Sequence, residues 1–249
     1  MPAYSLALCF DAPMQSWGTR SRGIIRDAGK EPSKSGVIGV LGAALGIPRD
    51  NREAIARLAQ LRMAVRVDRE GILERDYHTV QNVPTTTGTG HRTAVSHRYY
   101  LADALFLVVL EGEEQEKLDR ILAALQKPVW PLFLGRRAFP PARPLTTSGQ
   151  PNEPRTGLGL LKQPIDWVLA NHPWLEDRAE IRAAERQRND RSPLRTVADC
   201  APSDPAAETR LDLPISFAQS DRQFSTRAVR TGHVPLTDHL ITAEATSCT

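Results

Sequence analysis

The pattern of hydrophobic and polar positions predicts a chain that mixes strands and helices. Two continuous apolar runs of strand length lie at residues 4–10 and 104–110, and residues 63–67 alternate as a half-buried strand does. Helical spacing occurs at residues 36–46, at residues 52–61 and at residues 113–126. Residues 165–169 form a further short apolar run, which we expect to be a strand.

The order of these elements predicts the fold class. A strand, helices, a strand, a long hairpin, a strand and a helix make up most of a ferredoxin-like βαββαβ unit, which is also the framework of RNA-recognition domains. We therefore expect an α+β protein in which residues 1–140 form a ferredoxin-like (RRM-like) domain. Residues 141–249, which begin with a proline-dense stretch, are expected to form a linker and a smaller, mostly β C-terminal subdomain.

Residues 33–50 contain an unusual helical pattern. Gly36, Gly39, Gly42 and Gly46 recur at intervals of three or four, so they lie along one face of the predicted helix. A glycine inside a helix costs about 1 kcal/mol relative to alanine, and the close approach of another group is the usual compensation. That group is either a packed helix or strand, which the stretch alone favours, or a phosphate chain at the helix start.

Residues 74–100 predict a long β-hairpin that projects from this domain. Its arms, residues 77–81 and 92–100, contain strand-forming residues, and the connection at 83–90 is rich in threonine and glycine. Few large aliphatic side chains occur there, so the hairpin cannot bury a core face of its own. We interpret it as a polar, basic arm that a partner holds in place, and the alternative is a surface loop.

Charge adds a candidate partner to this picture. The chain has 32 lysine and arginine residues against 29 acidic ones, for a formal net charge of +3, and most of the basic residues are arginine. Arginine is suited to two-pronged recognition of phosphate and to stacking on rings. Arginines occur near Trp17 and Phe224, and two are adjacent within residues 134–137. These patterns are compatible with RNA contacts as well as with a solvated surface.

Several classes of protein are not favoured. The chain has no apolar run of the roughly 18 residues that a membrane span needs, and its first residues do not resemble a signal peptide. Cys9, Cys200 and Cys248 are too scattered for a disulfide framework or a zinc site. We therefore expect a cytoplasmic protein that binds no metal and no cofactor.

The histidines of the hairpin raise the question of catalysis. His78 and His97 lie near Tyr77 and Arg92, and such groups can cleave RNA by general acid–base chemistry without a metal. The two arms could bring these histidines together, although no spacing marks a catalytic pair. The serine–histidine–aspartate and paired-carboxylate arrangements have no signature in the chain. The sequence therefore predicts no catalytic residue.

Five segments, in this order, resemble one protein family. They read PMQSWG, PSKSGVIGVLGAALGIPRD, RDYHTVQ, PLFLGRR and DRQFSTR, and together they are similar to the CasD subunits of type I-E CRISPR Cascade complexes, which belong to the RAMP superfamily. Each segment alone is weakly specific, but five in sequence make a specific signal. The match covers residues 4–140 and returns at residues 221–227. Residues 140–208 depart from the family pattern, so the resemblance assigns no RNA contact there.

The resemblance implies an RNA-binding subunit without catalytic activity. Subunits of this family hold the repeat-derived 5′ handle of the CRISPR RNA (crRNA), and their hairpin is a thumb that packs against the handle and the adjoining backbone subunit. The resemblance implies that residues 77–100 are the thumb here, and that the glycine-rich helix and residues 134–137 lie on the handle side. It therefore favours a phosphate contact at the first turn of that helix. The implied partners are the crRNA 5′ handle, the backbone and large subunits of Cascade, and target DNA through the complex, with no membrane.

Two other functions remain open at this stage. One is a metal-independent endoribonuclease that processes CRISPR precursor RNA, as related subunits of another subtype do, and the other is a general protein-interaction module. The candidate RNA-contacting residues are Gln15, Trp17, Arg20, Arg26, Ser33, Lys34, Ser35, Gly36, Tyr77, His78, Thr79, Gln81, Arg92, His97, Arg136, Arg137, Arg222 and Arg227.

Overall fold

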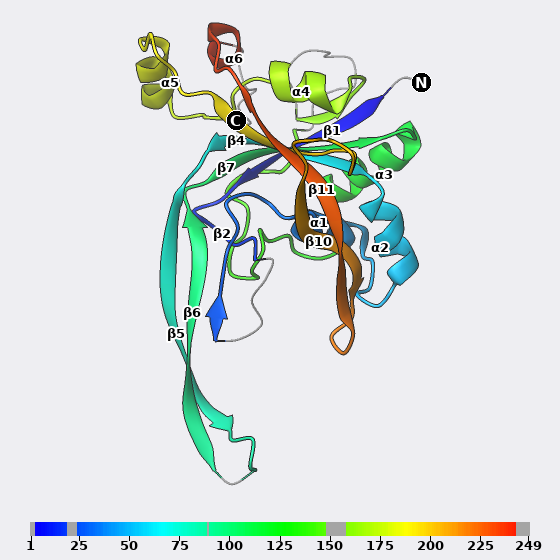
Figure 1. Cartoon of the computed structure of the whole chain (residues 1–249), viewed down its shortest axis with the longest axis vertical. Coiled ribbons are helices and arrows are strands. Elements are labelled where there is room, and N and C mark those ends of the chain that lie inside the picture. The colour runs from blue at the N-terminus through cyan, green and yellow to red at the C-terminus, as the bar shows by residue number, and fades with distance from the viewer. Residues whose placement is uncertain (1–2, 19–23, 89, 148–157, 243–249) are drawn as a thin grey trace.

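A seven-stranded sheet forms the centre of the protein (Figure 1). The structure, a computed structural model, describes residues 3–18, 24–88, 90–147 and 158–242. The strands lie in the order β10–β11–β9–β4–β7–β1–β8, and each is antiparallel to its neighbours. Their bounds are β1 Tyr4–Asp11, β4 Arg62–Arg69, β7 Leu105–Gly112, β8 Gly159–Leu161, β9 Leu194–Asp199, β10 Glu208–Phe217 and β11 Arg222–Val234.

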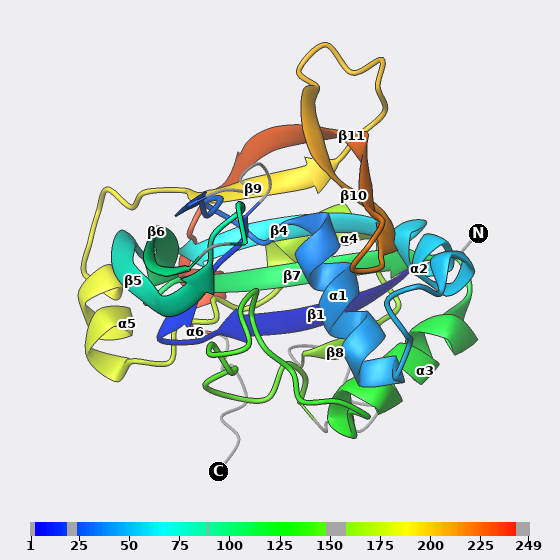
Figure 2. The same cartoon turned by 90° about the horizontal axis from the view of Figure 1, so that it is seen from below.

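Helices cover both faces of the central strands (Figure 2). In β1, Leu6 and Leu8 pack with side chains from α1, α2 and α3, whereas Ala7 and Cys9 pack with side chains from α4. Both faces are buried, which explains why β1 and β7 read as continuous apolar runs. Within the described ranges, no helix is long and apolar enough to cross a membrane. The helices are α1 Lys34–Leu45, α2 Arg52–Ala59, α3 Gln115–Gln126, α4 Ile165–Asn171, α5 Ala179–Arg186 and α6 Asp238–Thr242.

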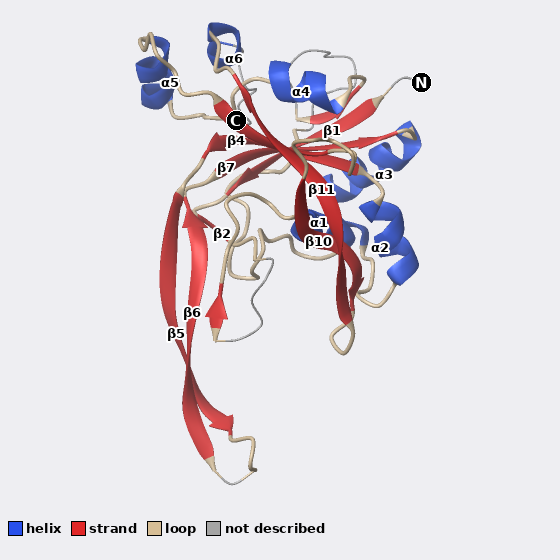
Figure 3. Cartoon of the chain, viewed as in Figure 1, coloured by secondary structure: helices blue, strands red, loops and turns tan. Residues whose placement is uncertain are grey.

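A long hairpin projects from this body as part of a second sheet (Figure 3). β5 (Ile72–Pro84) pairs along its length with β6 (His91–Ala102), and the short strands β2 (Met14–Gln15) and β3 (Ile25–Arg26) also pair with β6. The predicted hairpin is therefore confirmed. The register shifts between Val80 and Val83, where Asn82 has a φ of 59°, and such a bulge increases the local twist.

The helix α1 confirms the predicted glycine-rich helix and explains one of its glycines. Ser33 Oγ accepts a hydrogen bond from Gly36 N (3.3 Å), and Gly46, with a φ of 68°, ends the helix in the left-handed region. A Cβ at Gly36 would lie 2.8 Å from the ring of the buried Trp17. Close packing therefore accounts for Gly36. At Gly39 and Gly42 the place of a Cβ is open, since no described atom beyond the local backbone of the helix lies within 4 Å of it.

A buried network of ion pairs connects the start of α1 to β9, β10 and β11. Asp212 of β10 accepts a hydrogen bond from Lys34 N (2.8 Å), and Lys34 Nζ donates to Asp199 of β9 (2.7 Å). Arg227 of β11 binds both carboxylates, and its Nε lies 2.7 Å from Asp212 Oδ1. All four side chains are at most 15% exposed. The carboxylate of Asp212 thus satisfies the N-terminus of α1, as an anion there should.

The C-terminal half differs from the sequence prediction in one element. Residues 165–169 begin the helix α4 and not a strand. Pro164 precedes the first turn, and Ile165, Val168 and Leu169 are buried at the spacing i, i+3, i+4. β9 pairs with β4, so β9, β10 and β11 continue the central sheet. The division of the chain near residue 140 stays a prediction.

Arg227→Met should lower the free energy of unfolding by about 3 kcal/mol, because it leaves the buried carboxylates of Asp199 and Asp212 with one cation fewer. Chemical denaturation measures this change. Arg230→Met, on the same strand, is the matched control. The Arg230 side chain is 57% exposed and lies 3.5 Å from Asp204, so the expected change is within about 0.5 kcal/mol. Equal losses in the two variants would contradict the stabilising role of the network.

Candidate nucleic-acid interface

Three arginines, which we call the basic cluster, lie close together on and beside the β5–β6 hairpin, whose position is shown in Figure 1. Arg26 of β3 and Arg98 of β6 are register partners in neighbouring strands. Arg136 lies on the loop that follows α3, and its Nη2 donates to Tyr99 O (2.7 Å). Arg98 Nε donates to Ser96 Oγ (3.1 Å), which helps to fix its guanidinium.

The charges of the basic cluster act on one another. Burial lowers the pKa of the Arg136 guanidinium, and the positive charges of Arg98 and Arg26 lower it further, while the carboxylate of Asp76 acts in the opposite direction. Asp76 is the register partner of Arg98 on β5. A bound phosphate would offset the repulsion among the guanidiniums and could accept several charge-assisted hydrogen bonds. The basic cluster is therefore chemically suited to a phosphate group.

A glycine positions Arg136 against the hairpin. Gly135 has a φ of 92°, and a Cβ there would collide with the carbonyl oxygen of Ser16. Leu134 is fully buried, and its carbonyl accepts a hydrogen bond from Ser16 N (3.2 Å). This turn thus needs glycine both for its backbone conformation and for the close approach of Ser16. The Leu-Gly-Arg-Arg order in the sequence is explained by this packing.

The opposite face of the hairpin carries a row of apolar and aromatic side chains, in which Tyr77 and Ile25 are exposed and His97 is half-buried. Tyr77 and Ile25 flank His97 as its register partners on β5 and β3. Tyr77 is 64% exposed, and the centre of its ring lies 5.6 Å from that of His97. We call Tyr77, His97 and Ile25 the outer row. Exposed rings of this kind are platforms on which nucleobases stack.

The histidines of the hairpin do not form the pair that catalysis would require. His97 is paired with Tyr77 and His78 with Ser96. Because successive residues of a strand point to opposite faces, His78 and His97 lie on opposite faces of the hairpin. His78 Nδ1 is 3.6 Å from Asp76 Oδ2. Among the described residues, no group of three or more histidine, cysteine or acidic side chains is arranged to hold a metal ion.

The start of α1 is not available to a phosphate, which revises part of the sequence prediction. Asp212 already occupies the helix N-terminus. Ser33 and Lys34 are each 5% exposed, and Lys34 and Arg227 are bound to the buried carboxylates. In this fold, the start of the helix is therefore bound by a carboxylate of the chain itself.

Two further candidates, Gln15 and Trp17, lie inside the protein. Gln15 is fully buried and its Nε2 donates to Ala104 O (2.8 Å), and Trp17 is 1% exposed. Burial of these side chains, like that of Ser33, Lys34 and Arg227, removes them from the candidate surface. Ser35 and Gly36 next to them are partly exposed.

The remaining candidates lie on the surface at two places. Thr79, Gln81 and Arg92 are exposed along the hairpin, and Arg137 is exposed beside the basic cluster. Arg222 is exposed on the β10–β11 hairpin, where its guanidinium lies 5.3 Å from the centre of the Phe224 ring. This second hairpin is separate from β5–β6 (Figure 1). Arg20 lies outside the described residues.

Arg98 is a site residue that the sequence prediction did not include. It lies in the predicted hairpin arm among several polar residues, and nothing in the local pattern distinguishes it from its neighbours. Its position beside Arg26 and Arg136 depends on the parallel pairing of β3 with β6. The excess of arginine in the sequence indicates that a basic site could exist. It does not identify which arginines lie close together in the fold.

Comparisons with known proteins agree with the resemblance found in the sequence. The chain is 36% identical over 154 residues to the CRISPR system Cascade subunit CasD of Escherichia coli (strain K12), a match that covers 56% of this chain and 68% of the relative. A chain of a CRISPR RNA-guided surveillance complex is 31% identical, with a TM-score of 0.69 over 93% of this chain and 91% of that one. A crystal structure of a Cas protein is 33% identical, with a TM-score of 0.66 over 93% of this chain and 95% of that one.

The family is established by a match over nearly the whole sequence. Residues 5–230 match the profile of the family described as CRISPR-associated protein (Cas_Cas5). The matched residues include the central sheet apart from the first residue of β1 and the end of β11, and they include the β5–β6 hairpin and the basic cluster. The fold and the resemblance of the five sequence segments are thus accounted for together, and the chain belongs to the CRISPR-associated Cas5 family.

Proposed function

We propose that this chain is an RNA-binding subunit of a type I-E CRISPR Cascade complex in antiviral defence, that it holds the 5′ handle of the crRNA, and that it is not an enzyme. The observation that carries the proposal is the basic cluster, three guanidiniums brought together on and beside an exposed hairpin. The names of the relatives, a Cascade subunit and an RNA-guided surveillance complex, support it.

The two faces of the hairpin suggest how the handle is held. Phosphates of the RNA lie against Arg26, Arg98 and Arg136, with Arg137 beside them. Bases stack on Tyr77 and His97 of the outer row, since every base has a face that can stack on a ring. Further contacts come from residues exposed along the hairpin, namely Thr79, Gln81 and Arg92.

The ferredoxin-like (RRM-like) unit is also part of the proposal. It consists of β1, α1, β4, β7, α3 and β8, with the β5–β6 hairpin inserted between its second and third strands. The order β4–β7–β1–β8, in which the first and third strands are central, supports this assignment. The packing of α1 and α3 on the same face also supports it.

The partners follow from the same proposal. The hairpin is the thumb, which contacts the handle and the adjoining backbone subunit, while the body contacts the large subunit. Target DNA is reached through the complex, and the complex acts in the cytoplasm. The exposure of most of β5 and of the tip of the hairpin supports a surface that a partner covers.

Arg98→Gln combined with Arg136→Gln should weaken binding of a handle RNA about tenfold at low salt. It should also reduce the magnitude of the slope of log K against log salt by about two. Each phosphate contact that forms on binding releases counterions, and the double variant forms about two such contacts fewer. Fluorescence anisotropy at several salt concentrations measures both. Arg120→Gln, an exposed arginine on α3, is the control and should leave the slope unchanged. An unchanged slope in the double variant would show that the basic cluster does not contact phosphate.

Replacing residues 83–90 by a Gly-Gly turn should impair incorporation into Cascade while the melting temperature changes little. The reason is that residues 83–88 and 90, the described part of the tip, contribute no side chain to the buried clusters of the body. Size-exclusion chromatography of reconstituted complexes and circular dichroism melting measure the two quantities. A melted spectrum at room temperature would contradict the claim.

The non-catalytic proposal and the endoribonuclease alternative predict different results for the variant His78→Ala. Since His78 and His97 lie on opposite faces of the hairpin, the non-catalytic proposal predicts that the wild-type chain leaves labelled repeat RNA intact, and that His78→Ala behaves identically on a denaturing gel. Cleavage by the wild-type chain that disappears in His78→Ala would favour the endoribonuclease.

A further inference from the structure

Strand β10 has an inverted pattern of polar and apolar positions. Asp212 and Ser216 are buried, at 3% and 0% exposure, whereas Leu211 and Ile215 are 51% and 39% exposed. A strand with one solvated face normally buries its aliphatic side chains and exposes its polar ones. In β10 the buried side is occupied by the ion pairs of Asp212, so the aliphatic side chains point outward. Exposed aliphatic side chains that gather in this way indicate a contact surface.

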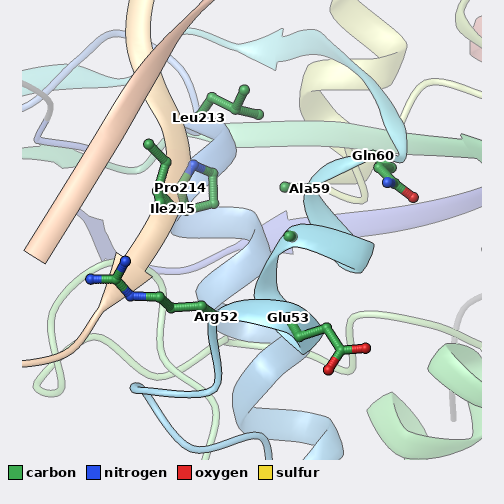
Figure 4. A pocket seen from close by; sticks show the side chains of 8 residues that line it. Arg52, Glu53, Ala59, Gln60, Leu213, Pro214 and Ile215 are labelled. Carbon is green, nitrogen blue, oxygen red and sulfur yellow. The ribbon is translucent and has the colours of Figure 1, made fainter.

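Of these two side chains, Ile215 borders a groove between β10 and α2 (Figure 4). The groove has a volume of about 620 Å³. Its apolar lining residues are Ala56, Ala59, Leu213, Pro214 and Ile215, and Arg52, Glu53 and Gln60 complete it. Figure 4 shows the strand and the helix facing each other across this space. The groove therefore offers aliphatic contacts from two different elements.

The charges at the groove favour a protein over RNA. Arg52 is paired with Asp221, and Glu53 is paired with Arg57. Arginines neutralised in this way have little to offer a phosphate, whereas RNA binding depends on phosphate contacts. An apolar floor with paired charges at its edge resembles the core and rim of a protein–protein interface.

The strand itself favours a helix as the occupant. β10 is the outermost strand of the central sheet, so a partner strand could in principle add to its edge. Pro214 has no N–H to donate, and a proline in an edge strand opposes such an addition. The side chains of Leu213, Pro214 and Ile215 remain as the contact from β10, and an amphipathic helix can pack its aliphatic side chains into such a groove.

We infer that the α2–β10 groove binds an amphipathic helix of a neighbouring protein subunit. The inference rests on the proposed function, because that function supplies the neighbouring subunits. The groove and the β5–β6 hairpin lie on opposite sides of the molecule (Figures 1 and 2). RNA on the basic cluster and a protein helix in the groove can therefore be bound at the same time.

Ala56→Glu combined with Ile215→Ser, two exposed positions that line the groove, tests the inference. In a complex reconstituted from purified Cascade subunits and crRNA, the double variant should be incorporated about tenfold less tightly, as expected when a central aliphatic contact is removed and a charge is placed in the groove. Its melting temperature and the affinity of the isolated chain for handle RNA should be unchanged. Trp167→Ser, at an equally exposed position on α4 (40% exposed), is the control and should assemble normally.

A second measurement leaves the groove almost intact. A photo-crosslinking amino acid at Ile215, in the same reconstituted complex, should join the chain to aliphatic residues of one helix in a partner subunit. A crosslink to crRNA or to a second copy of this chain would overturn the inference, as would equal assembly of the double variant and the wild type.

The two proposals fail in distinguishable ways. If the wild-type chain neither binds handle RNA nor enters the complex, the proposed function is wrong. If the wild type does both and the double variant does so equally well, only the assignment of the groove is wrong.

Discussion

The ion pairs among Lys34, Asp199, Asp212 and Arg227 are the constraint on which the arrangement of the C-terminal half depends. A buried network that lacks one member contains an uncompensated charge, which destabilises the fold. The four residues therefore have to be buried together. They come from α1, β9, β10 and β11. The network therefore sets the position of the last three strands against the N-terminal helix, and it accounts for the inverted pattern of β10.

The arginines of the chain have two different roles. Arg227 lies between two carboxylates, and Arg66 is fully buried with Asp68 and three backbone carbonyls. Such arginines are part of the folded core. In the basic cluster, Arg26, Arg98 and Arg136 instead lie close to one another, and repulsion between like charges is tolerated where a ligand offsets it. The arginine bias of the composition thus includes arginines that stabilise the fold and the three that form the candidate site.

The sequence predicted those elements whose signal is local. The apolar runs of β1 and β7 and the helical faces of α1, α2 and α3 are visible in short windows, and the structure confirms them. The segment at residue 165 was misread because a short buried helix and a buried strand have the same composition. The partners of Lys34 are 165 and 178 residues away in the chain, so its burial has no local signal. The opposite orientation of His78 and His97 depends on strand register, which the sequence does not display.

Continuous packing connects the two proposed binding surfaces. Asp212 of β10 holds the start of α1, Gly36 of α1 contacts the ring of Trp17, and Ser16 beside it receives the turn at Gly135 that positions Arg136. Each of these contacts is close and largely buried, and close-packed interiors resist small displacements. The groove beside β10 and the basic cluster are therefore held at a fixed separation. A subunit that binds an RNA end on one side and a protein on the other needs this rigidity, since the position of one partner then determines the position of the other.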